Sequence, residues 1–409
     1  MTTLIEARTR RLLPSDPLAR RLALATLVNR FGTGLFMTIS ALYFTRIVGL
    51  SVTQVGLGLT IAGGFGVAAG VPAGHAVDRF GARWLLPSLV LVEAAGLVAY
   101  TQVHSMATFL PVLCFVAFVD QSSNTVRNTV IAIAVPLDER ATTRAYLRAV
   151  TNVGIGAGSG VAAIALQADT RSAYVTLILF NAACFVVAAV LLGQLRVARP
   201  APRADDEAGA PRPRRAFTDW PFLTITVLNA VLTLQFGLME VGLPLWIAGH
   251  TRAPRILVSV VFLVNTVMIV FLQVRSSRRI DSVGAAGRAA RRSGILLGAA
   301  CLIYALAGQS GVWLAASVIL VGSIVQTFGE LISSAAGWTL SYDLSAPDAP
   351  GAYQGVFASG FAAGQMLAPV VVTVTAIHLG PPGWAILAAV FALAGVAFVP
   401  ATAWAQRTR

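Results

Sequence analysis

Six charged residues lie inside long apolar runs of this 409-residue sequence, where charges are costly and usually serve a function. They are Arg30, Glu93, Asp120, Arg127, Glu240 and Glu330. A buried carboxylate can take up a proton and release it when a neighbouring arginine withdraws or approaches. We therefore predict proton exchange at Asp120, Glu240 or Glu330. We prefer the two glutamates as carriers, expect Asp120 to be a structural or gating acid, and interpret Glu93 as a packing residue.

The run that contains Asp120 has the richest polar pattern. Asp120, Asn124 and Arg127 follow the spacing i, i+4, i+7 and therefore share one helical face. That face must point inward, because an unpaired charge in lipid is costly. The long side chain of Arg30, on the first run, could reach Asp120. We predict a cluster of Arg30, Asp120 and Arg127 that lines a cavity; the alternative is an ion pair that only locks two helices.

Two further polar stripes occur in the second half of the chain. Asn229, Thr233 and Glu240 fall at i, i+4 and i+11, which predicts one shared face. Gly242 and Pro244 follow them and indicate a bend. The other stripe consists of Ser323, Gln326, Glu330 and Ser334. We expect Asn229 and Gln326 to contribute polar groups to the same cavity.

The elements that must position these residues are membrane helices. Hydrophobic residues make up 56% of the chain and charged residues 11%, against about 25% charged in soluble proteins. The apolar runs reach the roughly 20 residues that a spanning helix needs, and they lack the alternation of barrel strands. We predict an all-α membrane protein with twelve spans, at 22–45, 53–74, 84–104, 106–133, 145–167, 172–195, 220–247, 256–274, 293–310, 312–337, 352–378 and 382–404.

The net charge of +13 follows the topology of the chain. With a cytoplasmic N-terminus, 24 arginines fall on the inner side and 4 on the outer side, which predicts that both termini are cytoplasmic. Nucleic-acid binding is therefore not expected. All 30 basic residues are arginine, so the lysine-containing phosphate loop of ATPases is absent. The cysteines and histidines show no metal-ligand spacing, and we expect neither a metal nor a cofactor.

The chain also divides into two similar halves. Residues 196–219 are rich in Pro, Gly and mixed charge, which predicts a cytoplasmic linker between bundles at 1–195 and 220–409. Asp78-x-x-Gly81 recurs as Asp281-x-x-Gly284, an offset of 203 residues. Ala145-Tyr146 recurs as Ala352-Tyr353, an offset of 207 residues. Two echoes at nearly one offset indicate an internal duplication.

The loop between the second and third spans carries a known family motif. It reads Gly74-x-x-x-Asp78-Arg79-x-Gly81-x-Arg83, and it resembles the loop signature of major facilitator transporters. The resemblance implies two pseudo-symmetric six-helix bundles with a substrate site between them, and alternating access. The Gly-rich fifth span, with glycines at 154, 156, 158 and 160, is also similar to the family's exporters, although tight helix packing explains it more simply.

The same resemblance assigns roles within the loop motif. Asp78 would cap the N-terminus of the eleventh helix, where an anion meets the positive end of the helix dipole. Gly81 would permit the tight turn. Arg79 and Arg83 would face acids of the inner loops, such as Asp138 and Glu139. This conformational-switch cluster would stabilise the outward-open state, and its release would permit inward opening.

Among subfamilies the chain looks most like bacterial twelve-span drug/proton antiporters. This implies proton-coupled efflux of small amphipathic compounds, such as a drug, an antibiotic or a secondary metabolite, by a monomer in the bacterial inner (cytoplasmic) membrane. The alternative is an importer or facilitator of a small nutrient in the same fold. A membrane enzyme or a receptor is disfavoured, because His75, His104, His250 and His378 do not cluster and no loop could hold a sensory domain.

Overall fold

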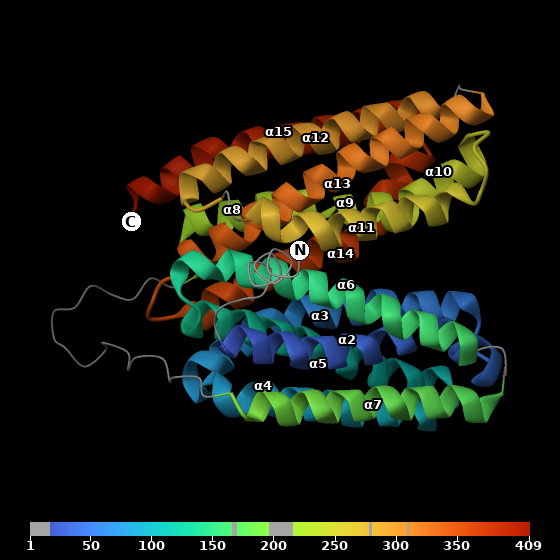
Figure 1. The fold of residues 1–409 in the computed structure, drawn as a ribbon, viewed down its shortest axis with the longest axis vertical. Coiled ribbons are helices and arrows are strands. Elements are labelled where there is room, and N and C mark those ends of the chain that lie inside the picture. The colour runs from blue at the N-terminus through green and yellow to red at the C-terminus, as the bar shows by residue number, and fades with distance from the viewer. Residues whose placement is uncertain (1–16, 166–169, 196–215, 278–279, 309–310) are drawn as a thin grey trace, which may run out of the picture. The chain divides into compact units, whose positions relative to one another are not determined.

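The protein is helical throughout the part of the chain that the computed structural model describes, residues 17–165, 170–195, 216–277, 280–308 and 311–409 (Figure 1). Within these residues, eleven helices are long and apolar enough to cross a membrane. The predicted fifth span forms the helix α6 (Leu137–Ala165), which is less apolar because charged residues fill its first turns and glycines its later ones. The predicted all-α membrane fold is confirmed.

The first six predicted spans correspond to six long helices. They are α2 (Pro17–Leu42) with the π-helical turn η1 (Tyr43–Ile47), α3 (Val52–Phe80), α4 (Ala82–Ala99) with the 3₁₀ turn η2 (Tyr100–Gln102), α5 (Met106–Ala134), α6, and α7 (Arg171–Gly193). Most of the predicted linker, up to residue 215, lies outside the described residues, as do Arg278 and Arg279 of a predicted inner loop.

The second half repeats this organisation with one interrupted helix. Its seventh span consists of α8 (Trp220–Thr233), α9 (Gln235–Gly237), the π-helical turn η5 (Leu238–Gly242) and α10 (Leu243–His250). The other spans are α11 (Leu257–Ser277), α12 (Val283–Ala307), α13 (Val312–Asp343), α14 (Pro350–Val372) with η6 (Thr373–Ile377), and α15 (Pro381–Arg407).

The chain forms two compact units. The first unit contains Met1–Arg214 and Ser345–Ser359, and the second contains Arg215–Leu344 and Gly360–Arg409. The first turns of α14 therefore belong with the first unit, which the sequence analysis did not anticipate. The predicted bundle and linker boundaries themselves stay a prediction.

Helix pairing follows the same scheme in both units. In the first unit α2 packs on α7, α3 on α5, and α4 on α5 and α7. In the second unit the equivalent helices do the same: α8 packs on α15, α11 on α13, and α12 on α13 and α15. Equivalent pairings are expected of a duplicated six-helix bundle.

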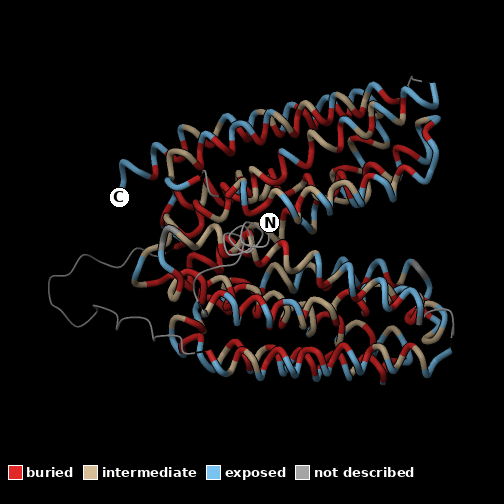
Figure 2. The backbone as a smooth tube through the Cα atoms, in the orientation of Figure 1, coloured by how far each residue is buried: buried red, intermediate tan, exposed pale blue. Residues whose placement is uncertain are grey.

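The helix surfaces are suited to lipid. Figure 2 shows buried and exposed positions interleaved along most helices, so that each helix has an inward and an outward face. Large apolar side chains lie on the outward faces, among them Ile164, Phe271 and Trp313, which are 71%, 73% and 82% exposed. Soluble proteins avoid large apolar surface of this kind, whereas hydrocarbon solvates it.

Candidate functional site

A polar cluster joins α2 and α5 in the first unit. Asn124 lies at its centre: its Oδ1 accepts hydrogen bonds from Arg30 Nη2 at 3.0 Å and Arg127 Nη1 at 3.3 Å. Its Nδ2 donates to Asp120 Oδ2 at 3.2 Å. Arg30 Nη2 also lies 4.0 Å from Asp120 Oδ1. The structure thus brings together Arg30 and the three residues that the sequence analysis placed on one face of α5.

Glu93 on α4, which the sequence analysis interpreted as a packing residue, completes the charge balance of this cluster. Glu93 and Arg127 are only 4% and 5% exposed. Ser123 Oγ donates to Glu93 Oε2 at 3.5 Å, and Asp120, Arg30 and Arg127 are the charged groups that act on this carboxylate. Two guanidinium groups therefore face two carboxylates, which offsets much of the cost of their burial. Asp120, at 41% side-chain exposure, forms the open end of the cluster.

Glycines on α6 determine how closely α2, and with it Arg30, can approach. A β-carbon at Gly158 would collide with the carbonyl oxygen of Phe31, and one at Gly154 would come within 3.1 Å of the β-carbon of Arg30. At Gly156 and Gly160 a β-carbon would meet no atom within 4 Å. The spacing of four residues places Gly154 and Gly158 on one helical face. Small residues at this face permit close helix packing.

The second unit holds the other two candidate acids. Glu330 on α13 is 3% exposed, and Asn265 Nδ2 on α11 donates to Glu330 Oε2 at 3.0 Å and to Thr327 Oγ1 at 3.1 Å. Glu240 is near enough for its carboxylate and that of Glu330 to interact electrostatically. Sequence reasoning missed Asn265, which is the only strongly polar residue of an otherwise apolar stretch of α11, a signal that could have identified it.

Asn229, Thr233 and Glu240, which the sequence predicts on one face, differ in burial. Asn229 and Thr233 are buried, whereas Glu240 is exposed. Glu240 lies in η5, a π-helical turn that departs from the α-helical period on which the predicted face depends. Gly242 and Pro244 lie at the junction of η5 with α10, and the bend predicted there stays a prediction.

Gln326 stabilises that irregular segment. Its side chain is fully buried, its Oε1 accepts from the Tyr304 hydroxyl at 2.7 Å, and its Nε2 donates to the carbonyl oxygen of Gln235 at 3.1 Å. Gln235 begins α9, and its carbonyl oxygen accepts from the Gln326 side chain in addition to the backbone N–H of Leu238. Gln326 thus takes part in the packing of this segment, and its predicted contribution to the cavity stays a prediction.

The loop motif contacts the start of α14, inside the first unit. Asp78 Oδ1 accepts from the backbone N–H of Gly351 at 2.8 Å, and Asp78 Oδ2 from that of Ala352 at 2.8 Å. The carboxylate thus lies at the positive end of the α14 dipole. Gly74 and Gly351 are in such close backbone contact that a β-carbon on either would collide with the other's carbonyl oxygen. Gly81 joins α3 to α4 with φ 81°, a conformation that favours glycine.

The arginines of the motif lie over neighbouring rings. The Arg79 guanidinium carbon is 5.4 Å from the centroid of the Phe80 ring, and that of Arg83 is 5.2 Å from the Trp84 ring. The side chain of Asp138, one of their predicted partners, lies outside the described residues. The predicted contacts of Arg79 and Arg83 with inner-loop acids therefore stay a prediction.

The second copy of the motif differs in structure. Ser282 is the N-cap of α12, and its side chain accepts from the backbone N–H of Ala285 at 3.3 Å. Gly284 therefore lies inside the helix, one residue after its start, and does not form a turn as Gly81 does. A serine at the position of Arg79 thus provides a cap and starts the helix early.

Asp78→Asn is expected to lower the free energy of unfolding by about 1–3 kcal/mol, because the amide replaces one accepting oxygen by a donor and removes the charge that meets the helix dipole. Unfolding of the purified protein in detergent, followed by circular dichroism, measures this. Asp281→Asn, the matched change in the second motif at an exposed position, should leave stability unchanged. Equal losses in both variants would contradict the capping role.

Metal chemistry has no candidate ligand set in the described part of the chain, where no three His, Cys, Asp or Glu residues group closely enough to hold an ion. The chemical resources are instead carboxylates that can exchange protons and arginines that can bind anions. The carboxylates divide into two settings. Glu93 and Asp120 lie among arginines. Glu330 instead accepts a hydrogen bond from Asn265, and Glu240 interacts electrostatically with Glu330.

Comparisons with known proteins support a transporter fold. A family model described as Major Facilitator Superfamily matches residues 22–369. No curated protein sequence matches the chain. Solved structures match almost over the full length, although identity is low.

Three of these structures illustrate the match. A bacterial homologue of the iron transporter ferroportin, in an outward-facing state, has 15% identity and a TM-score of 0.72, with 96% of this chain and 100% of that chain covered. The E. coli fucose:proton symporter FucP has 16% identity and a TM-score of 0.70, with 94% and 98% covered. The human organic anion transporter MFSD10 (TETRAN) has 15% identity and a TM-score of 0.63, with 94% and 100% covered. At this identity the likeness shows the fold alone.

Proposed function

This chain belongs to the Major Facilitator Superfamily, and from that membership we propose that it is a proton-coupled secondary transporter. It moves a small molecule across the bacterial inner membrane by alternating access, as a monomer with both termini in the cytoplasm. The substrates are small amphipathic compounds such as a drug, an antibiotic or a secondary metabolite, exported in exchange for protons. Membrane lipid surrounds the protein and solvates its apolar outer surface.

The observation that carries the proton-coupling proposal is the setting of Glu330. Its buried carboxylate accepts a neutral hydrogen bond from Asn265 and lies near a second acid, Glu240. Acidic side chains inside a membrane helix bundle are typical of proton pathways. Glu330 and Glu240 are therefore the proposed proton carriers.

The first-unit cluster has a different proposed role. Asp120 has Arg30 as a partner and shares Asn124 with Arg127, so its carboxylate belongs to a network of charge-assisted hydrogen bonds. It acts as a structural or gating acid, and Arg30, with 16% side-chain exposure, offers a positive group to a substrate. The contact of Asp78 with α14 stabilises one conformational state, and its release accompanies the transition to the other.

Glu330→Gln is expected to abolish substrate-dependent proton flux, since the amide has the same shape but cannot bind a proton. The purified protein is reconstituted in liposomes with a pH-sensitive dye inside, a pH gradient is imposed, and lipophilic cations, antibiotics, peptides and sugars are added in turn. Glu240→Gln tests the second acid. Asp348→Asn, in the segment between α13 and α14, is the matched control and should retain flux.

The direction of the fluxes separates the candidate functions. Substrate and protons that move in opposite directions support export. Movement in the same direction supports the alternative, uptake of a small nutrient, for which the fucose:proton symporter among the structural neighbours provides a precedent of fold only. Substrate movement without protons in the unmodified protein, or undiminished proton flux in both glutamate variants, would refute the assignment of the carriers.

A further inference from the structure

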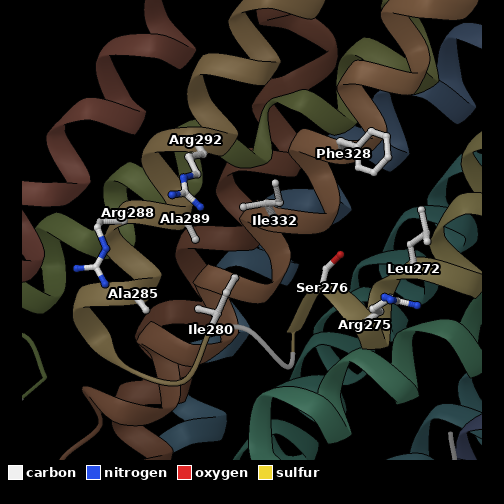
Figure 3. Close-up of a pocket in the computed structure, with 10 residues that line it drawn as sticks. All are labelled: Leu272, Arg275, Ser276, Ile280, Ala285, Arg288, Ala289, Arg292, Phe328 and Ile332. Carbon is white, nitrogen blue, oxygen red and sulfur yellow. The ribbon is translucent and has the colours of Figure 1, made fainter.

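A basic cleft opens on the second unit where α11 ends and α12 begins. It has a volume of about 480 Å³ and is bordered by α11, α12 and α13. Figure 3 shows Arg288 and Arg292 on one side, Arg275 on the other, and Ile280 and Ile332 between them. We call this set, together with Phe328, the arginine cleft.

The charge of the arginine cleft is not balanced within the described residues. The side chains that line it include no aspartate or glutamate. Arg288 and Arg292 are spaced i, i+4 on α12 and therefore project from one face. Like charges at this spacing repel each other. An anion bound beside both guanidinium groups would convert this repulsion into attraction, and phosphate oxygens suit guanidinium geometry especially well.

Part of the wall of the arginine cleft is apolar. A small hydrophilic anion would not need such a surface in order to bind. Leu272, Ile280, Phe328 and Ile332 contribute hydrocarbon surface to it, and Phe328 is 43% exposed. The appropriate ligand therefore has an anionic head and an apolar body.

The depth of the cleft along the helices points to lipid. Arg275 lies in the last turn of α11, after a run with mean hydropathy 2.5. Arg288 and Arg292 come in the first turns of α12, before its apolar part. The three arginines thus lie where apolar helix segments end, at the level of lipid headgroups. Basic groups at this level attract anionic lipids.

We propose that the arginine cleft binds an anionic phospholipid of the adjacent leaflet. Its phosphate lies beside Arg288 and Arg292, and the start of its acyl chains lies along Phe328 and Ile332. Arg275 adds to the local positive potential. This site depends on the membrane fold and not on the identity of the transported substrate.

The test measures lipid binding to the full-length protein in detergent by native mass spectrometry, with phosphatidylglycerol as the probe and phosphatidylcholine as the neutral comparison. Each arginine near an anionic membrane surface contributes about fivefold in affinity. The double variant Arg288→Gln, Arg292→Gln should therefore bind phosphatidylglycerol on the order of 20-fold more weakly. Arg291→Gln is the matched control, because Arg291 is exposed on the same turn of α12 but does not line the cleft.

Three outcomes would overturn the proposal. The first is equal weakening by Arg291→Gln, which would mean general surface charge. The second is equal binding of phosphatidylcholine and phosphatidylglycerol, which would mean no headgroup recognition. The third is inorganic phosphate that binds as tightly as the lipid, which would assign the cleft to a free anion. Unchanged unfolding midpoints of the variants ensure that a loss of binding reflects the site and not the fold.

Discussion

Arg127→Gln is expected to lower the free energy of unfolding by about 3–5 kcal/mol, because it leaves the buried Glu93 and the partly exposed Asp120 with Arg30 as the one remaining cation of the cluster. Glu93→Gln is expected to lower the free energy of unfolding by a similar amount, because it removes a negative charge that faces the buried guanidinium group of Arg127. The double variant restores the charge balance and should be much more stable than the sum of the two single losses implies. Unfolding of the purified protein by sodium dodecyl sulphate in mixed micelles measures all three.

Arg171→Gln is the control for this cycle, since Arg171 is an exposed arginine at the start of α7 and should contribute little. Strict additivity of Arg127→Gln and Glu93→Gln would show that the two charges do not interact. The residues of the cluster would then be buried close to one another without stabilising one another.

Gly158→Leu should be the most damaging single change on α6. Any side chain at this position meets the backbone of Phe31, so α2 must move away and carry Arg30 from Asn124. Overpacking of this kind costs about 3 kcal/mol, and substrate transport should fall with it. Gly156→Leu adds the same side chain two residues earlier, towards open space, and should raise stability by up to about 1 kcal/mol through its higher helix propensity.

The comparison of these two glycine variants, by the same unfolding measurement and by transport in liposomes, separates packing from helix propensity. Both leucines improve the intrinsic propensity of α6 by a similar amount. A loss of stability in Gly156→Leu as large as in Gly158→Leu would mean that the α2–α6 contact does not limit the position of Arg30.

Sequence patterns were informative wherever one regular helix sets the geometry. The spacing of Asp120, Asn124 and Arg127 fixed a common face because α5 is continuous across all three residues. Arg30 could be added because burial of these charges demands a partner. Glu93 was interpreted as a packing residue and not as a member of the cluster, because its partners lie on other helices and the pairing of α4 with α5 cannot be derived from periodicity.

Irregular backbone marks the limit of the same reasoning. The periodicity argument for Glu240 assumed a regular α-helix, whereas Glu240 lies in the π-helical turn η5, which no residue type in the sequence predicts. Gly284 matches the motif in sequence but does not adopt the turn conformation of Gly81. The reason is that Ser282 caps α12, so the helix already begins at Val283. Spacing and composition do not determine the domain boundaries. They also do not determine the roles of the site residues, which depend on the identity of the substrate.

The balanced charges of the first unit also bear on how the protein enters the membrane. A single charged residue at the centre of an isolated helix opposes insertion by roughly 2.5–3.5 kcal/mol. Arg30, Glu93 and the pair on α5 belong to three separate segments that leave the ribosome in succession. Each segment is apolar enough overall to cross a membrane, but its charge is neutralised only when the three helices come together. It follows that assembly of α2, α4 and α5 removes a cost that each helix carries while it is alone in the bilayer.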